Sequence, residues 1–188
     1  MAASAAKQLD GFIAKFTPDL AKRVHEVLAA CRTRVPGAIE LVYDNYNALA
    51  IGFGPTEKTG DIVFSIAVYP RWVSIFFNHG PELPDPDGLL IGSGSMVRHI
   101  VLDDGATTLA KRAVDRILSA ALAMSDPEID PTAKSRIVIK MISATQRPRR
   151  PAVNASLASP ARRGSRTGTK TASRPSRRGT ASSRASRR

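Results

Sequence analysis

Apolar residues recur every three or four positions in two stretches of the chain, which predicts two helices that each bury one face. The apolar positions of the first stretch are Leu20, Val24, Val27, Leu28 and Cys31. The Thr17-Pro18-Asp19 run is typical of a helix start, and Pro36-Gly37 is typical of a helix end. The apolar positions of the second stretch are Leu109, Ala113, Ile117, Leu118, Ala121 and Leu122. Residues 5–16 predict a further, shorter helix.

Between these helices the pattern changes to the short period and the β-branched and aromatic composition of strands. Such stretches cover residues 39–43, 47–53, 61–69, 72–77 and 97–102, and residues 136–143 predict a last edge strand. Only Pro70-Arg71 separates the third stretch from the fourth, so we expect a tight hairpin there. Short turns between strands favour an antiparallel meander. The predicted fold class is therefore α+β, an antiparallel sheet with helices packed on one face.

The composition changes at Arg147, and Val153 and Leu157 are the only large apolar residues after it. A segment of this kind cannot bury enough apolar surface to offset the conformational entropy that ordering would cost. We therefore predict two regions. Residues 1–146 form a folded domain, and residues 147–188 form a disordered, basic tail rich in Arg, Ser and Ala.

Charge is divided unevenly between these two regions. The formal net charge is +12, yet residues 1–146 carry 15 basic and 16 acidic residues, whereas residues 147–188 carry 13 basic residues and no acid. Twelve of those 13 are arginines, whose planar guanidinium groups suit phosphates. We predict contacts with the backbone of DNA or RNA through Arg149, Arg150, Arg162, Arg163, Arg166, Lys170, Arg177, Arg178, Arg187 and Arg188. The tail has no aromatic residue, so base stacking is not expected from it and binding should be independent of sequence.

A glycine-rich stretch suggests a second, weaker anion site. Gly92, Ser93, Gly94 and Ser95 could turn backbone amides and hydroxyls toward one point, with Arg98 adding a guanidinium, to hold a small anionic ligand. The stretch lacks the glycine spacing of nucleotide-binding loops, and a strand follows it rather than a helix. The alternative is that the glycines only bend the chain into the strand, with Arg98 paired to an acid such as Asp103 or Asp85.

The order of elements and motifs resembles a known family over about residues 8–124. A helix pair and Pro36-Gly37 precede a meander, a Leu-Pro-Asp-Pro loop, Gly92-Ser93-Gly94, Arg98-His99-Ile100 and a last helix. This arrangement is similar to that of the YdhG-like family of bacterial domains of unknown function. Family members usually carry lysine after the second glycine, where this chain has Ser95, so one cation of the supposed anion site is missing. The resemblance implies the α+β fold, and some members are described as frataxin-like iron chaperones.

Motifs for catalysis or resident metals do not emerge from the chain. His25, His79 and His99 form no metal-binding spacing, and no Ser/His/Asp or Cys/His arrangement can be assigned. Cys31 is the only cysteine and is predicted to be a buried thiol. The Asp85-Pro86-Asp87-Gly88 stretch lacks the acids of a calcium loop. Asp44-Asn45-Tyr46-Asn47 is typical of a turn, with a ligand-contacting loop as the alternative.

Two function classes follow from these observations. The first is a non-catalytic binding protein whose basic tail contacts nucleic acid. The second is a domain that binds a small ligand or iron and carries an incidental tail. No stretch approaches the roughly 20 apolar residues of a membrane span and no signal peptide is evident, so we expect a cytoplasmic protein, with nucleoid association as a corollary of the first class. No cofactor is expected, and the oligomeric state is not predicted.

Overall fold

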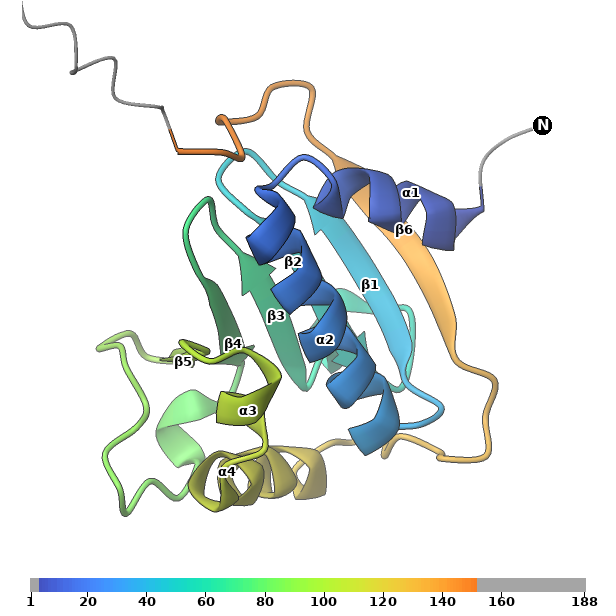
Figure 1. Ribbon diagram of the computed structural model, residues 1–188. Helices are drawn as coiled ribbons and strands as arrows, with labels where there is room; N and C mark the ends of the chain where they lie inside the picture. Colours follow the sequence, from blue (N-terminus) through green and yellow to red (C-terminus); the bar gives the residue numbers. More distant parts are fainter. Residues whose placement is uncertain (1–3, 152–188) are drawn as a thin grey trace, which may run out of the picture. The chain divides into compact units, whose positions relative to one another are not determined.

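The computed structural model describes residues 4–151, and the two stretches with helical spacing form its long helices, except that Leu109 of the second stretch lies in a separate one-turn helix (Figure 1). Helix α2 covers Pro18–Arg34 and helix α4 covers Arg112–Ala123, while α1 covers Ala5–Ile13 and the one-turn α3 covers Ala106–Leu109. The buried residues of α2 are the predicted ones, namely Leu20, Val24, Val27, Leu28 and Cys31. Within residues 4–151 no helix is both long enough and apolar enough to cross a membrane.

Six strands form one sheet in the order β5-β4-β3-β2-β1-β6. Their bounds are β1 Ile39–Asp44, β2 Leu49–Gly54, β3 Phe64–Val68, β4 Val73–Phe77, β5 Arg98–Val101 and β6 Arg136–Ile142. Strands β1 to β5 pair antiparallel with their neighbours in chain order, which confirms the predicted meander.

Strand β6 departs from the predicted pattern, because it pairs with β1 in parallel and makes the sheet mixed. The cause is the connection that precedes it. After β5, helices α3 and α4 and the following loop return the chain to the end of the sheet at which β1 begins (Figure 1). There the amide of Gly37 donates to Ser135 Oγ at 3.0 Å. The last strand therefore enters the sheet in the same direction as β1, on the edge that was predicted for it.

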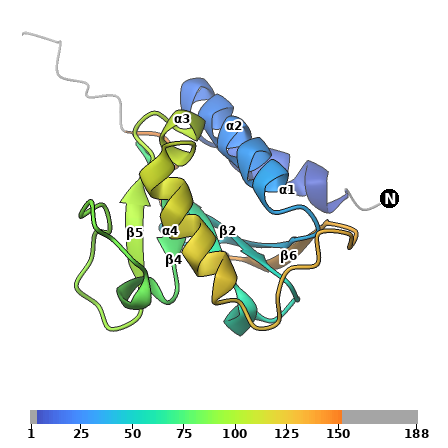
Figure 2. The same cartoon turned by 90° about the horizontal axis from the view of Figure 1, so that it is seen from below.

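Side chains alternate across the strands, so the sheet has two different faces. The covered face packs against all four helices and contributes Val42, Leu49, Ile51, Phe53, Phe64, Ile66, Val68, Val73, Ile75, Phe77 and Ile100 to the core. Helices α3 and α4 lie along one end of this face beside α2 (Figure 2).

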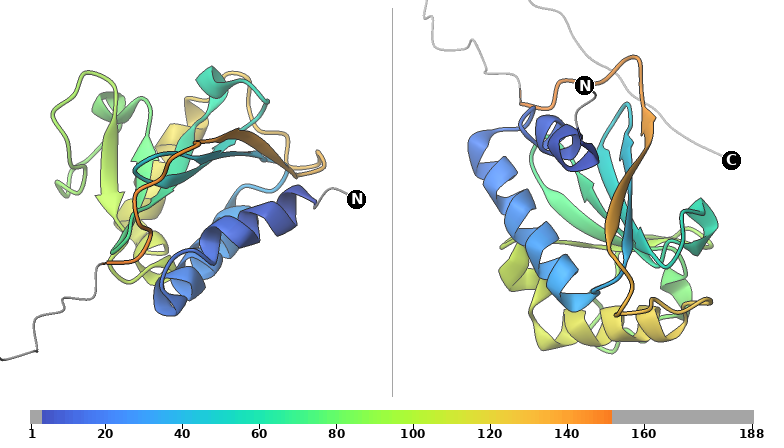
Figure 3. Two further views of the ribbon diagram at one scale, coloured as in Figure 1. Left: turned by 90° about the horizontal axis from the view of Figure 1, so that it is seen from above. Right: turned by 90° about the vertical axis from the view of Figure 1, so that its right-hand side faces the viewer.

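The opposite face of the sheet, called the open face below, has no helix longer than one turn over it among the described residues (Figure 3). At one end the short 3-10 turn η1, Thr59–Asp61, lies above it, and Ile39, Leu41 and Ile62 form a small cluster there. Further along this face, the alternation from the core residues places Tyr69, Trp72, Phe76 and His99 outward.

Candidate nucleic-acid interface

Arg149, predicted to belong to a free tail, is buried and only 5% exposed. Its Nη2 donates to Asp44 Oδ1 at 2.7 Å, and Lys15 Nζ donates to Asp44 Oδ2 at the same distance. Its guanidinium carbon also lies 5.6 Å from the centroid of the Phe16 ring, within the range of a cation–π interaction. The buried carboxylate needs a cationic partner, so this arginine serves the stability of the fold.

Opposing effects act on the pKa of Asp44. Burial raises it, but hydrogen bonds from Lys15, Gln146 and Arg149 outweigh the burial, so the pKa is lowered from its ordinary value. The carboxylate therefore stays charged at neutral pH and attracts both cations. The local sequence around Asp44 is typical of a turn, but in the structure Asp44 is the centre of a buried ion cluster.

Further hydrogen bonds hold the start of the predicted tail against the folded domain. The amide of Arg147 donates to Tyr46 O at 3.0 Å, and Arg150 Nε donates to Phe16 O at 3.1 Å. The boundary predicted after residue 146 therefore needs correction, because the folded unit includes residues 147–150. The remaining predicted contact residues lie outside the described residues, namely Arg162, Arg163, Arg166, Lys170, Arg177, Arg178, Arg187 and Arg188.

A groove with a volume of about 780 Å³ lies where this segment passes the turn between β3 and β4. Its lining residues are Asn47, Tyr69, Pro70, Arg71, Trp72, Arg147, Pro148, Arg150 and Pro151. The amide of Tyr69 donates to Trp72 O at 2.9 Å, which closes the predicted two-residue turn. The two aromatic rings stack with their centroids 5.0 Å apart. Trp72 nevertheless stays 44% exposed.

The groove is cationic as well as aromatic, because its lining holds three arginines and no acid. Within residues 4–151 the side chains of Arg71 and Arg147 have neither a hydrogen bond nor an ion pair, and both residues are exposed. Arg147 thus differs from Arg149, two positions further on, whose charge is matched by Asp44. Two unpaired guanidinium groups beside an exposed indole ring suit an anionic ligand with a flat face.

Beside the groove, a second hollow of about 620 Å³ lies on the open face. Its lining residues are Asn45, Tyr46, Asn47, Ala48, Ala50, Ser65, Ala67, Tyr69, Phe76 and Ser143. The two hollows share Asn47 and Tyr69, so they adjoin each other. Phe76 stacks on His99 with ring centroids 4.8 Å apart. The rings of Phe76 and His99 extend the aromatic surface of Tyr69 and Trp72 away from the turn.

The predicted anion loop has a different geometry. Gly92, Ser93, Gly94 and Ser95 are exposed, and Arg98 Nη1 donates to the carbonyl oxygens of Val97, at 2.9 Å, and Gly94. The loop therefore turns acceptors, not donors, toward the guanidinium, and it leads directly into β5. This geometry favours the interpretation of a bend that enters a strand.

Neither acid predicted as a partner for Arg98, Asp103 or Asp85, pairs with it among the described residues, and Asp85 has another role. Asp85 accepts hydrogen bonds from the amides of Leu89 and Leu90, each at 2.8 Å, and it thereby fixes the proline-rich loop. Asp87 is paired with Arg116 at 2.6 Å. These carboxylates serve the structure of the loop and its attachment to α4.

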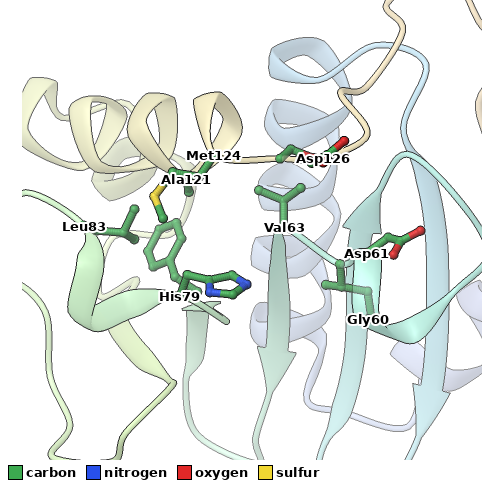
Figure 4. Close-up of a pocket in the computed structure, with 11 residues that line it drawn as sticks. Gly60, Asp61, Val63, His79, Leu83, Ala121, Met124 and Asp126 are labelled. Carbon is green, nitrogen blue, oxygen red and sulfur yellow. The ribbon is translucent and has the colours of Figure 1, made fainter.

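A smaller cleft of about 210 Å³ lies between η1, the residues after β4 and the end of α4 (Figure 4). His79 lines it and contacts Glu82 Oε1 through Nδ1 at 3.3 Å. Figure 4 shows that the carboxylates of Asp61 and Asp126 do not converge on the His79 ring. Throughout residues 4–151 no group of three or more His, Cys, Asp and Glu side chains is placed to hold a metal ion.

Cys31 is fully buried in α2, as predicted. Burial, with a smaller contribution from the Glu40 carboxylate, raises the pKa of its thiol to about 12. A thiol that stays protonated and out of reach of solvent is a core residue rather than a nucleophile.

Comparisons with protein-family models, with curated proteins and with solved structures found no match to this chain. The resemblance to the YdhG-like family thus stays a prediction. The role of the groove is therefore argued from its lining residues alone.

The groove is not predicted from the sequence, although the sequence contains part of the pattern that forms it. Pro70-Arg71 was recognised as a turn, and a two-residue turn places its flanking residues, Tyr69 and Trp72, opposite each other. Val68 and Val73 face the core, so the next pair outward must face the other way. The passage of residues 147–151 beside this turn depends on the buried Asp44, and no local pattern indicates it.

Proposed function

We propose that this chain is a non-catalytic binding protein whose basic C-terminal region contacts the phosphate backbone of DNA or RNA without reading base sequence. The observation that carries the proposal is the run of 13 Lys and Arg residues without one acid over residues 147–188. The segment contains no acid that could neutralise these cations. A nucleic acid can neutralise them with its phosphates, and the release of counterions from those phosphates favours binding.

The described residues refine the proposal. Arg149 is engaged by Asp44, so it does not count among the phosphate contacts. Arg71 and Arg147 are exposed and unpaired within residues 4–151, so they add two cations from the folded unit. The ten Lys and Arg residues after Pro151 supply the rest of the charge.

The second function class has less support. A YdhG-like domain that handles iron would need carboxylates or histidines gathered in one place, and residues 4–151 offer no such group. A small anionic ligand at Arg98 would have to displace carbonyl oxygens that already accept from it. We retain the family resemblance as a proposal about the origin of the fold and assign it no activity.

The test is a gel-shift titration of two chains of equal length. The first is the natural chain. In the second, glutamine replaces the ten cations after Pro151, which are Arg162, Arg163, Arg166, Lys170, Arg174, Arg177, Arg178, Arg184, Arg187 and Arg188. Residues 147–150 are kept in both chains because Arg149 belongs to the fold.

With about 6–10 phosphates engaged, the affinity of the natural chain should fall by a factor of roughly 10³–10⁵ between 50 and 200 mM salt. It should differ little among unrelated duplexes. The glutamine chain should lose most of the affinity and the salt dependence. Equal binding by the two chains, or no binding by the natural chain at low salt, would refute the proposal.

A further inference from the structure

We infer that the groove beside Trp72 binds an unpaired base of a single-stranded nucleic acid, with Arg71 and Arg147 on the neighbouring phosphates. This inference rests on the proposed function and adds to it a preference for single strands over duplexes. The tail cannot supply that preference, because it contains no aromatic residue.

The first argument is the exposure of Trp72. A tryptophan that is 44% exposed leaves a large apolar face in water, and packing within the fold does not account for it. Tyr69 stacks behind it at 5.0 Å with an angle of 21° between the rings. The closed two-residue turn fixes both residues at the adjoining ends of β3 and β4, next to the last strand pair Val68 and Val73. The result is a rigid flat surface whose orientation is set before a ligand arrives, so little entropy is lost on stacking.

Charge complementarity identifies the occupant. Elsewhere on the described surface Arg34, Arg116 and Arg136 each pair with a carboxylate, at 2.9, 2.6 and 2.7 Å. Arg71 and Arg147 lack such a partner among the described residues, as does the exposed Arg112 outside the groove. What distinguishes Arg71 and Arg147 is that both line the groove with Trp72 and that no acid is part of that lining. Two cations in one groove with an exposed aromatic ring match a ligand that alternates anionic groups with flat faces. Single-stranded nucleic acid has this composition, whereas an acidic peptide has the charge without the flat faces.

The room available favours a single strand as well. In a duplex both faces of an interior base are covered by its neighbours, so no face is free to stack on Trp72. A groove of about 780 Å³ that adjoins a hollow of about 620 Å³ offers room for a strand that passes from the turn onto the open face. Asn47, shared by both hollows, presents an amide to the edge of a base without requiring one particular base.

The experiment uses the full chain and its only tryptophan as the reporter. Tryptophan emission and binding anisotropy are measured with oligo(dT) and with a duplex of the same length, at low salt. We expect oligo(dT) to quench the emission of Trp72 by stacking and the duplex to bind without quenching it. The Trp72→Ala chain should bind oligo(dT) about tenfold more weakly, in line with the free energy of one stacked base. Its affinity for the duplex should change less than about twofold.

A pair of arginine variants distinguishes the effect of an arginine in the groove from the effect of losing one positive charge anywhere on the surface. Arg71→Ala should weaken oligo(dT) binding, whereas Arg112→Ala removes the same charge from the first residue of α4, which lines neither hollow, and should weaken it less. Melting curves of all variants establish that they are folded.

The outcomes distinguish this inference from the proposed function. If neither nucleic acid binds the natural chain, both fail. If both bind with equal affinity and Trp72 emission does not change, the groove has no role and the tail alone carries the proposed function. If a proline-rich peptide quenches the emission and oligo(dT) does not, the groove is a peptide site and the inference is overturned.

Discussion

The two faces of the sheet come from the same strands but have opposite compositions. The covered face consists of large aliphatic and aromatic side chains, and Ile66, Ile75 and Phe77 on it are completely buried. The open face alternates small residues such as Ser65 with exposed or partly exposed rings such as Trp72. Folding accounts for the first composition, because burial of apolar area is its main driving force. It does not account for rings left in water, and this difference is the ground for our proposal that the open face binds a ligand.

Charged residues repeat the same contrast. On the covered side of β1, Glu40 and Asp44 are buried and each is bound by cations, Glu40 by Arg32 at 2.7 Å. At the edge of the open face, Arg71 and Arg147 are exposed and have no partner within residues 4–151. A buried charge needs an oppositely charged partner within the fold. An exposed charge is solvated by water, so it can remain unpaired until a ligand binds.

The largest expected effect comes from a charge placed on the covered side. Val24 of α2 is fully buried among core residues, so Val24→Asp would bury an unpaired carboxylate. The cost is about 3–5 kcal/mol or more, a large part of the stability of a domain of this size. We expect circular dichroism to show no cooperative melting transition.

The control is the same charge on the open face. Ser65 is only partly buried there, so Ser65→Asp should leave a cooperative transition with a slightly lower midpoint. If Val24→Asp melted at the same temperature as the natural chain, the assigned face of α2 would be incorrect.

Two neighbouring phenylalanines on β4 offer a matched pair for the next prediction. Phe77 is completely buried on the covered face, and Phe76 is partly exposed on the other. Phe77→Ala should cost about 3–5 kcal/mol of unfolding free energy, measured by urea titration. Phe76→Ala should cost only about 1 kcal/mol, because less area leaves water when the ring packs. Equal losses would contradict the assignment of the two faces.

The buried ion cluster gives an effect of about the same size as Phe77→Ala and, in addition, a test of coupling. Asp44→Ala would leave Arg149, whose side chain is 3% exposed, without its carboxylate, and should cost about 3–5 kcal/mol. Arg149→Met should cost less, because Lys15 still pairs with Asp44 at 2.7 Å. The double variant should lose less than the sum of the two single losses, as urea titrations of all four chains would show. Strict additivity would mean that the pair contributes nothing beyond its separate residues.

The hydrophobic period predicts the covered face well, because burial there depends on local spacing. The face of α2 and the meander of β1 to β5 both follow from apolar positions along the chain. The parallel pairing of β6 does not follow from the hydrophobic period. It depends on where α4 and its following loop return the chain, and that is decided by packing between distant elements.

The surface is predicted less well for the same reason. The composition of residues 147–150 is typical of the basic tail. No residue near Arg149 in the sequence indicates that Asp44 lies beside it in the fold. Spacing could have placed Tyr69 and Trp72 on one face, but it could not show that Arg147 approaches them. Functional surfaces assembled from distant segments need long-range contacts, and a local pattern does not encode these.

The smallest expected effect is the pH dependence that Asp44 gives to stability. The pKa of Asp44 is lower in the folded chain than its ordinary value, which in unfolded chains is about 4. Its carboxylate therefore contributes stability that is present above about pH 4 and is lost as the pH falls through the folded-state pKa. Urea midpoints at pH 7 and pH 3 measure this loss.

Asp44→Asn should be less stable at pH 7 and should lose less stability on acidification than the natural chain. Tyr43→Phe, which changes the neighbouring residue on the open face, should keep the acid loss of the natural chain, because it leaves the Asp44 carboxylate and its partners Lys15 and Arg149 unchanged. An unchanged acid loss in Asp44→Asn would mean that other carboxylates carry the pH dependence.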